Sequence, residues 1–469
     1  MGQLKHLGFT ALAALAAVGA GCGGATVVEH ADPQVVTLEG ALGNTFVPAG
    51  QPQPMVARVR VGTRPLSRGT RPPINLALVV DTSGSMLGQP IDDAREASGA
   101  LLDLLAEGDR LTVVTFGSQT QLLLPSTELD DDNLSELRSH IAEMEASGTT
   151  DMAGGIRAGL QELMANFRSD GINRMVLLGD GVPNAEADIL PLAQAAGERG
   201  ITITALGLGL DYNETLMGQI AQISGGRFHY VEDSARVAAL FRSEVLRLER
   251  VFGRNAVVTL QPGPGIQIDS VVGQNVTATG GAVRVLLGDL TEGEQRDLYV
   301  RLTVGGHRDG ASVELMDVNL SFEDAVDGVG QLERRVFLGA RATTSAEQIA
   351  QGRNADVERG AERVQAAAVT VEAIRVARGG ELDRARAMLD EARFRAQTVA
   401  TDSGDTDLAA QAESMSVLSG ALPSVAPAPT APPVDFSDDS GAVETEAGGA
   451  DGARRTREVH QRAMEVLGF

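Results

Sequence analysis

Strand-like and helix-like hydrophobic patterns alternate along the middle of the chain, up to about residue 248. Apolar runs at 74–81, 110–116, 173–180 and 201–209 predict buried strands. Between these runs, apolar residues recur every three or four positions, which is the period of an amphipathic helix. Such alternation predicts an α/β fold in which right-handed crossovers build a doubly wound, mainly parallel sheet.

From about residue 254 to residue 340 the helical period disappears, and strand patterns separated by Gly-rich turns remain. This change predicts an added antiparallel β-sandwich domain. An isolated strand pattern at residues 56–61, "VARVRV", has no predicted partner in the α/β region. We therefore expect it to pair with the later β-domain, which makes the α/β domain an insertion within the sandwich.

The composition of the remaining residues divides them into further predicted segments. Residues 344–419 are rich in Ala, Arg and Glu at helical spacing, and Gly379-Gly380 interrupts them, so they predict a C-terminal helical hairpin with a packing role. The predicted organisation is a signal peptide at 1–21, a lipid tether at 22–54, a strand segment at 55–73, the α/β domain at 74–249, the β-sandwich at 250–343, the helical hairpin region at 344–419, a disordered Pro-rich and acidic linker at 420–452, and a short basic helix at 453–469.

The N-terminal sequence predicts export. An apolar stretch from Leu7 to about Val18 and several small residues precede Cys22, which is the only cysteine. The stretch is typical of a secretory signal, and the position of Cys22 resembles the lipobox of bacterial lipoproteins, where the cysteine is lipidated. Gly19 stands where the lipobox usually has a large aliphatic residue, so ordinary signal-peptide cleavage is the alternative. We expect an exported, lipid-anchored protein of the bacterial cell envelope, at the outer membrane, that contacts the membrane only through its lipid.

Charge and composition exclude several functions. The formal net charge is −24, aromatic residues make up 3% of the sequence, and there is no Trp. Nucleic acid repels a strongly acidic protein, and base stacking needs aromatic rings, so we expect no nucleic-acid partner. Lys5 is the only lysine. A phosphate-binding P-loop, a kinase site and a Schiff base each need a lysine ammonium, so these activities are excluded.

Small polar residues follow the predicted strands at their carboxyl ends. Asp81, Ser83 and Ser85 alternate after the first buried strand, Thr150 lies between a Gly turn and a helix start, and Asp180 ends the third strand. Alternate side chains of an extended segment point the same way, so Asp-x-Ser-x-Ser can direct one carboxylate and two hydroxyls to one point. Oxygen ligands suit a hard divalent cation, and open α/β sheets bind ligands at this edge.

Alternatives to this metal site stay open. Thr149 could replace Thr150 as a ligand, although Thr150 directly precedes the predicted helix start. The Asp and Ser side chains could also serve only to satisfy backbone groups in a strand-to-helix turn. No catalytic function is indicated, because Ser83 stands where an aspartic protease needs Gly and where an aspartyl-nucleophile phosphatase needs Asp.

The motifs "VVDTSGSM", "GTTDM" and "LLGDGVPN" resemble, in this order, the three loops of the metal-ion-dependent adhesion site of the von Willebrand factor type A (VWA) domain. Residues 207–245 also resemble the bacterial secreted branch described as calcium-activated chloride channel-like. The resemblance implies the VWA fold and a divalent cation, with Mg²⁺ expected and Mn²⁺ or Ca²⁺ as alternatives. It implies a protein partner whose acidic side chain completes the coordination. The ligands carried over are Asp81, Ser83, Ser85, Thr150 and Asp180.

The sequence departs from the family pattern at two positions. Gly179 stands where a hydroxyl residue is frequent, and Gly117 where an acidic residue is frequent. Neither position is a direct ligand, so we expect the site to be retained. With the N-terminal signal, the resemblance implies a cell-envelope lipoprotein that binds a protein partner, not an enzyme. The alternative is an assembly or chaperone-like subunit that recruits an ATPase or another enzyme complex.

Overall fold

The computed structural model describes residues 35–65, 71–130, 132–179, 183–208, 213–231, 236–248, 250–274, 276–279, 281–422 and 447–467. The signal peptide, Cys22, Asp180 and most of the predicted linker lie outside these residues. Within the described ranges, no helix combines the length and the apolar character that crossing a membrane requires.

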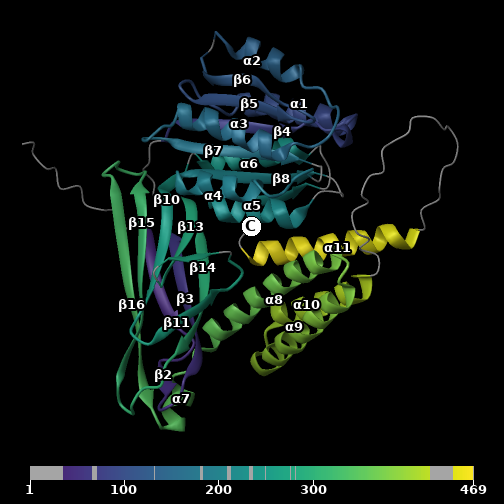
Figure 1. The fold of residues 1–469 in the computed structure, drawn as a ribbon. Coiled ribbons are helices and arrows are strands. Elements are labelled where there is room, and N and C mark those ends of the chain that lie inside the picture. The colour runs from purple at the N-terminus through teal and green to yellow at the C-terminus, as the bar shows by residue number, and fades with distance from the viewer. Residues whose placement is uncertain are drawn as a thin grey trace, which may run out of the picture. The chain divides into compact units, whose positions relative to one another are not determined.

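A six-stranded sheet with strand order β6-β5-β4-β7-β8-β9 forms the centre of the α/β domain (Figure 1). Strand β5 pairs antiparallel with β6, and the other neighbours pair in parallel. The predicted doubly wound, mainly parallel sheet is therefore confirmed. The strands are β4 Ile74–Asp81, β5 Arg110–Phe116, β6 Thr120–Glu128, β7 Ile172–Gly179, β8 Ile201–Leu208 and β9 Phe228–Val231.

Helices cover both faces of this sheet, which explains why its central strands are apolar throughout. Alternate residues of β4 face opposite ways: Leu76 and Leu78 pack with α1, α2 and α6, whereas Ala77 and Val79 pack with α3, α4 and α5. A parallel strand buried on both faces has a continuous apolar sequence. The helices are α1 Gln89–Leu102, α2 Leu134–Ala142, α3 Met152–Ala165, α4 Ile189–Glu198, α5 Glu214–Ser224 and α6 Val237–Leu248.

Two sheets form the β-sandwich, with strand orders β1-β3-β14-β11 and β12-β13-β10-β15-β16-β2, and all their pairs are antiparallel except β16 with β2. Strand β3, which contains residues 56–61, lies between β1 and β14. The α/β domain therefore lies in the chain between two parts of one sandwich. The strands are β1 Val36–Leu42, β2 Phe46–Pro48, β3 Gln53–Thr63, β10 Val251–Pro262, β11 Ile266–Val271, β12 Thr277–Thr279, β13 Ala282–Thr291, β14 Gln295–Val304, β15 Ser312–Asp324 and β16 Gln331–Thr343.

The tether predicted at 22–54 is wrong over its described part, because β1 and β2 belong to the sandwich. The sequence of β1, "VTLEGAL", lacks a clear alternation of apolar and polar residues. Its Gly40 is needed for packing, since a Cβ there would lie 2.7 Å from Leu338 Cδ2 on β16. A strand that packs through a glycine has no apolar side chain at that position, so its pattern resembled a linker.

The C-terminal region is a bundle and not the predicted single hairpin. Helices α8, α9 and α10 pack together, and the short helix α7 precedes them. The break after α9 was missed: Gly404 adopts a left-handed conformation (φ 69°), and the Asp405 carboxylate accepts hydrogen bonds from Asp407 N and Leu408 N at the start of α10. The helices are α7 Ala346–Gln351, α8 Ala355–Arg378, α9 Leu382–Ser403 and α10 Thr406–Ala421.

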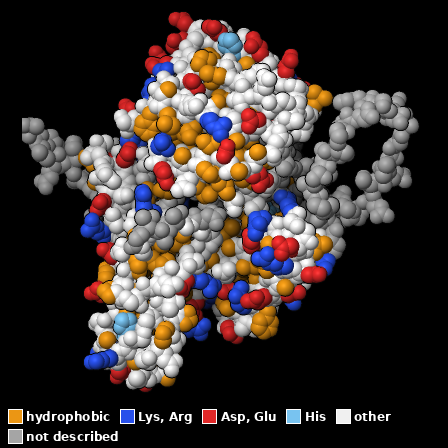
Figure 2. Space-filling view, in the orientation of Figure 1, with side chains coloured by type: hydrophobic (Ala, Val, Ile, Leu, Met, Phe, Trp, Pro, Cys, Tyr) orange, Lys and Arg blue, Asp and Glu red, His pale blue; other side chains and the backbone are white. Residues whose placement is uncertain are grey.

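A last helix, α11 (Ala447–Val466), packs along α8 and touches α10. It begins inside the predicted linker at 420–452, so that linker is helical at its end. Figure 1 shows α11 between α5 of the α/β domain and α8. In the space-filling view, acidic and basic side chains are interspersed over the region of α9 and α10 (Figure 2), where Arg393 and Asp390 form one of several ion pairs a single turn apart.

Buried ion pairs join the α/β domain to the sandwich. Arg174 on β7 donates from Nη2 to Asp289 Oδ2 on β13 at 2.9 Å, and both side chains are more than 90% buried. Glu294, just before β14, binds Arg227 and accepts from Arg296 Nε at 2.6 Å. Burial alone would raise the pKa of Glu294, but the charges of Arg296 and Arg227 outweigh burial and lower it to about 2. Glu294, which therefore stays ionised at neutral pH, links Arg227 of the α/β domain to Arg296 of the sandwich.

Candidate metal site

The candidate site lies at the carboxyl edge of the central sheet, between β4 and β7. The chain passes from β4 to β5 on one side and later forms β7 on the other, so these neighbours mark the switch point of the sheet. Open α/β sheets bind ligands in the crevice at such a point. Asp81 ends β4 and is completely buried, and a Cβ added at Gly179, the end of β7, would lie 3.4 Å from Asp81 Oδ2. The two strands thus end side by side.

The loop after β4 holds the first three predicted ligands close together. Asp81 Oδ1 accepts a hydrogen bond from Ser83 N at 2.8 Å, which bends the chain immediately after the strand. The hydroxyls of Ser83 and Ser85 lie 3.0 Å apart. Ser83 is buried and Ser85 is exposed, so the cluster runs from the sheet to the surface. The short 3-10 helix Gly84–Met86 then leads toward α1.

Backbone hydrogen bonds attach two further loops to this one. Gly84 N donates to Gly148 O at 2.9 Å, and Ser147 N donates to Thr82 O at 2.7 Å. Thr82 N in turn donates to Phe116 O, at the end of β5, at 2.8 Å. Main-chain hydrogen bonds therefore help to position the loops after β4 and before α3 relative to each other.

The structure distinguishes Thr150 from Thr149. Thr149 is exposed, and its hydroxyl donates to Ser118 Oγ at 3.3 Å. Thr150 is buried, and its carbonyl accepts from Asn184 N, in the loop after β7, at 3.1 Å. The next residue, Asp151, caps α3 by accepting from Gly154 N at 3.0 Å. Thr150 therefore links the loop before α3 to the loop after β7, whereas Thr149 contacts the turn between β5 and β6.

The glycine at 117 has a packing reason. A Cβ at Gly117 would lie 2.8 Å from Ser147 O and 3.3 Å from Thr82 O, which is closer than side chains normally approach. Its carbonyl accepts from Asp151 N at 2.9 Å. An acidic residue at 117 would therefore push the loops apart. The glycine in this chain allows the loops to pack closely at the position where the family frequently has an acidic residue.

The described donor atoms fit a hard divalent cation. Neighbouring ligands of an octahedral Mg²⁺ with bonds of about 2.1 Å lie about 3 Å apart, which is the separation of the Ser83 and Ser85 hydroxyls. A hydrogen bond between the two hydroxyls has the same length. In the part of the chain that is described, no three His, Cys, Asp or Glu residues lie together to hold a metal. The predicted ligand set is not a group of this kind, because it includes the hydroxyls of Ser83, Ser85 and Thr150 and because Asp180 lies outside the described residues.

Sequence reasoning missed two residues that build the site. Ser118 accepts hydrogen bonds from both Thr149 N and Thr149 Oγ1, and Asn184 N bonds to Thr150 O. Ser118 lies in the short turn between β5 and β6, where a serine is an ordinary turn residue. Its role depends on a loop that is distant in sequence, so no local signal could have found it.

Comparison with known proteins agrees with this geometry. The family profile for the von Willebrand factor type A domain matches residues 75–243. The chain is 29% identical to the uncharacterized protein sll0103 of Synechocystis sp. over 58% of this chain and 66% of that protein. The chain therefore spans slightly less than two thirds of this relative. The relative is uncharacterized, so the chloride channel-like branch stays a prediction.

Two solved structures have a similar fold. A von Willebrand factor type A protein from Catenulispora acidiphila matches with a TM-score of 0.64 at 20% identity, over 82% of this chain and 88% of that chain. The ArnB paralog VWA2 from Sulfolobus acidocaldarius matches with a TM-score of 0.58 at 16% identity, over 91% of this chain and 98% of that chain. Both likenesses extend beyond the α/β domain to the added regions. Residues 75–243 of this chain form a von Willebrand factor type A domain.

Proposed function

We propose that the VWA domain binds a protein partner through a divalent cation held by Asp81, Ser83, Ser85, Thr150 and Asp180. The observation that carries the proposal is the meeting of buried Asp81 with two serine hydroxyls 3.0 Å apart at the switch point of the sheet. VWA domains typically mediate protein–protein interactions and commonly bind a divalent cation, which supports the same function. Mg²⁺ is the proposed ion, with Mn²⁺ or Ca²⁺ as alternatives.

The proposed ligands leave room for the partner. Two carboxylates at most balance the charge of a divalent ion, and the three hydroxyls add none. Mg²⁺ in such surroundings keeps water ligands and dehydrates reluctantly. A Glu or Asp side chain of the partner would replace one water and complete the coordination. Binding would then depend on both the metal and the acid.

Thermal melting of the full chain tests the metal site. Melting temperatures are measured with Mg²⁺, Mn²⁺ or Ca²⁺ and with a chelator, for the wild type and for Asp81→Ala. A ligand present at 100 times its Kd stabilises the folded state by about 2.7 kcal/mol, so we expect a rise with Mg²⁺ that the substitution removes. Thr150→Ala should reduce the rise, whereas the matched control Thr149→Ala should retain it.

If Mg²⁺ alone does not change the melting temperature, the addition of acetate tests whether a carboxylate must complete the site. If the site fills only when a carboxylate completes it, Mg²⁺ and acetate together should raise the melting temperature of the wild type but not of Asp81→Ala. If neither addition changes the melting temperature of the wild type, the proposed metal site is refuted. Equal responses of the wild type and Asp81→Ala would place any bound ion elsewhere.

We also propose that Cys22 carries the lipid of a cell-envelope lipoprotein. The support is the position of this sole cysteine after an apolar N-terminal stretch. Expression of the full chain with labelled palmitate, beside Cys22→Ser, tests the proposal. Label in the wild type alone, with the protein in the membrane fraction, is the expected result. An unlabelled protein in the cytoplasm would instead favour the assembly subunit that recruits a cytoplasmic enzyme.

A further inference from the structure

Helix α11 (Ala447–Val466) uses one face to join two hydrophobic cores. Its buried residues recur every three or four positions, which places them on a single side of the helix. Met464 belongs to the core of the VWA domain, and half-buried Val459 packs against the core of the helical bundle. The buried or half-buried residues of this face are Thr456, Val459, His460, Ala463, Met464 and Leu467.

The groove that receives this face is formed by three parts of the chain. A Cβ added at Gly218 on α5 would lie 2.2 Å from the Met464 methyl carbon, so the glycine makes space for this side chain. A Cβ at Gly273, in the turn after β11, would lie 2.5 Å from Leu467 Cδ2. Helices α8 and α10 form the rest of the groove. The fit of Met464 and Leu467 against two glycines makes the groove specific for this helix.

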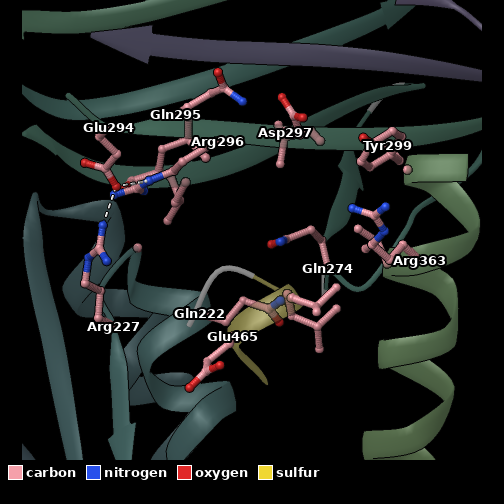
Figure 3. Close-up of a pocket in the computed structure, with 18 of the residues that line it drawn as sticks. Gln222, Arg227, Gln274, Glu294, Gln295, Arg296, Asp297, Tyr299, Arg363 and Glu465 are labelled. Carbon is pink, nitrogen blue, oxygen red and sulfur yellow. Dashed lines mark hydrogen bonds and ion pairs between the residues drawn. The ribbon is translucent and has the colours of Figure 1, made fainter. Parts of the chain in front are cut away.

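The end of α11 also lines one side of a cavity of about 570 Å³ (Figure 3). Glu465, Val466 and Leu467 line one side of the cavity, and β14 with its Tyr299 lines another. Gln222 on α5 also lines it and donates to Gly273 O at 2.6 Å. Without α11 this cavity would be open to solvent along the side that Glu465 now occupies.

Two features distinguish α11 from the other helices of the bundle. Short turns join α8 to α9 and α9 to α10, whereas the long segment 423–446, which lies outside the described residues, separates α11 from α10. The buried face of α11 also includes two polar residues, Thr456 and His460. In contrast, α8 buries one polar residue, Thr370, and the buried residues of α9 are Ala and Leu throughout. Helix α11 thus packs as an amphipathic helical ligand packs in a groove.

We propose that the groove between α5, α8 and α10 is a helix-binding site and that α11 is its exchangeable, intramolecular occupant. The proposal goes beyond the metal site and does not depend on it. Release of α11 would remove Met464 from the VWA core and Val459 from the bundle, and would open the cavity further. Asn213 caps the start of α5, and its Nδ2 donates to Glu186 Oε1, in the loop after β7, at 2.8 Å. The occupant of the groove therefore touches the helix that supports one loop of the candidate metal site.

The test uses the full chain with a protease site inserted within residues 423–446. After cleavage, a fluorescent peptide of residues 447–469 is added, and its binding is followed by fluorescence polarisation. We expect the labelled peptide to replace the cleaved helix while the rest of the protein stays folded. A Met464→Ser peptide should bind roughly 30-fold more weakly, because truncating a buried Met removes apolar contact. The matched peptide Arg462→Ser, changed on the exposed face, should bind within about threefold of the wild type.

Hydrogen exchange of the uncut full chain provides the second measurement. If α11 opens by itself, its amides should exchange at least tenfold faster than those of the central strands β4 and β7, since local opening costs less than global unfolding. The proposal is overturned if α11 exchanges only as fast as these strands. It is equally overturned if the cleaved protein takes up no labelled peptide, or if the Met464→Ser peptide binds as well as the wild type.

Discussion

The candidate metal site and the interface between the VWA domain and the sandwich use polar residues in opposite ways. At the interface, charged side chains such as Arg174 and Asp289 bind each other and are buried. At the candidate site, main-chain hydrogen bonds between Gly84 and Gly148 and between Ser147 and Thr82 position the loops. Side-chain charge therefore stabilises the junction between domains, whereas backbone hydrogen bonds help to position the loops of the candidate site. Buried charge alone would have pointed to the junction and not to the candidate site.

Breaking the interface pair should have the largest effect on stability. Asp289→Ala removes the nearer of the two carboxylates that neutralise the buried Arg174 guanidinium, so we expect the free energy of unfolding to fall by about 3–5 kcal/mol. Urea denaturation measures the change. The double variant Arg174→Met/Asp289→Leu should recover most of the loss, because apolar residues can replace a buried pair. The rise in melting temperature with Mg²⁺ should persist in the double variant, and its loss there would contradict the separation of the two regions.

Acid should weaken the same region, and the effect expected for each carboxylate is slightly smaller. Burial would raise the pKa of Glu244, but the hydrogen bond from His229 and the charge of Arg174 lower it to about 2, from 4.5 in the unfolded chain. Glu294 has a similarly lowered pKa. A carboxylate with a lowered pKa stabilises the fold above pH 4.5, and this stability is lost as the pH falls from about 4.5 to about 2. Each such carboxylate accounts for roughly 3 kcal/mol.

Urea denaturation between pH 7 and pH 2 measures this loss, with Glu294→Gln as the comparison. The variant should be less stable than the wild type at pH 7 and should lose less stability toward pH 2, because it has one fewer group to protonate. Identical slopes against pH for the two proteins would show that Glu294 does not bind its arginines as described. The Mg²⁺ response should be compared at pH 7 alone, where Glu294 is ionised in the wild type.

The smallest effect is expected at the cap of α3. Asp151→Ala removes the hydrogen bond from Gly154 N and should cost about 1 kcal/mol. Asp151→Asn retains a capping oxygen and should cost little. Because α3 begins directly after Thr150, the alanine variant should also lower Mg²⁺ affinity modestly, as measured by titration with melting temperature as the readout. A larger loss of affinity than in Thr150→Ala would make Asp151, and not Thr150, the ligand.

The fold of the VWA domain could be predicted because its strands are buried on both faces. The continuous apolar run of β4 and the polar residues that follow it place Asp81 at the edge of the sheet without any knowledge of distant contacts. The same argument placed Thr150 correctly at a helix start. These features could be predicted because they depend only on residues a few positions apart in the sequence.

Features that depend on distant contacts could not be predicted. Strand β1 packs through Gly40 against Leu338, so its pattern gave no strand signal. The pair of Arg174 and Asp289 joins residues 115 positions apart. The third helix of the bundle is a different case, since the Gly404-Asp405 stop and start signal was present in the sequence and was missed. Distance along the chain explains the first two failures but not the third.

The insertion of the VWA domain within the sandwich sets an order of events during synthesis. Arg60 on β3 binds Asp297 on β14, and these partners are 237 residues apart in the chain. Strands β1 and β3 leave the ribosome long before their partner β14, while every strand of the inserted domain is already available. The VWA domain can thus fold first, and the sandwich can close only after β14 has emerged. Until then the early strands have unpaired edges, which other chains could bind.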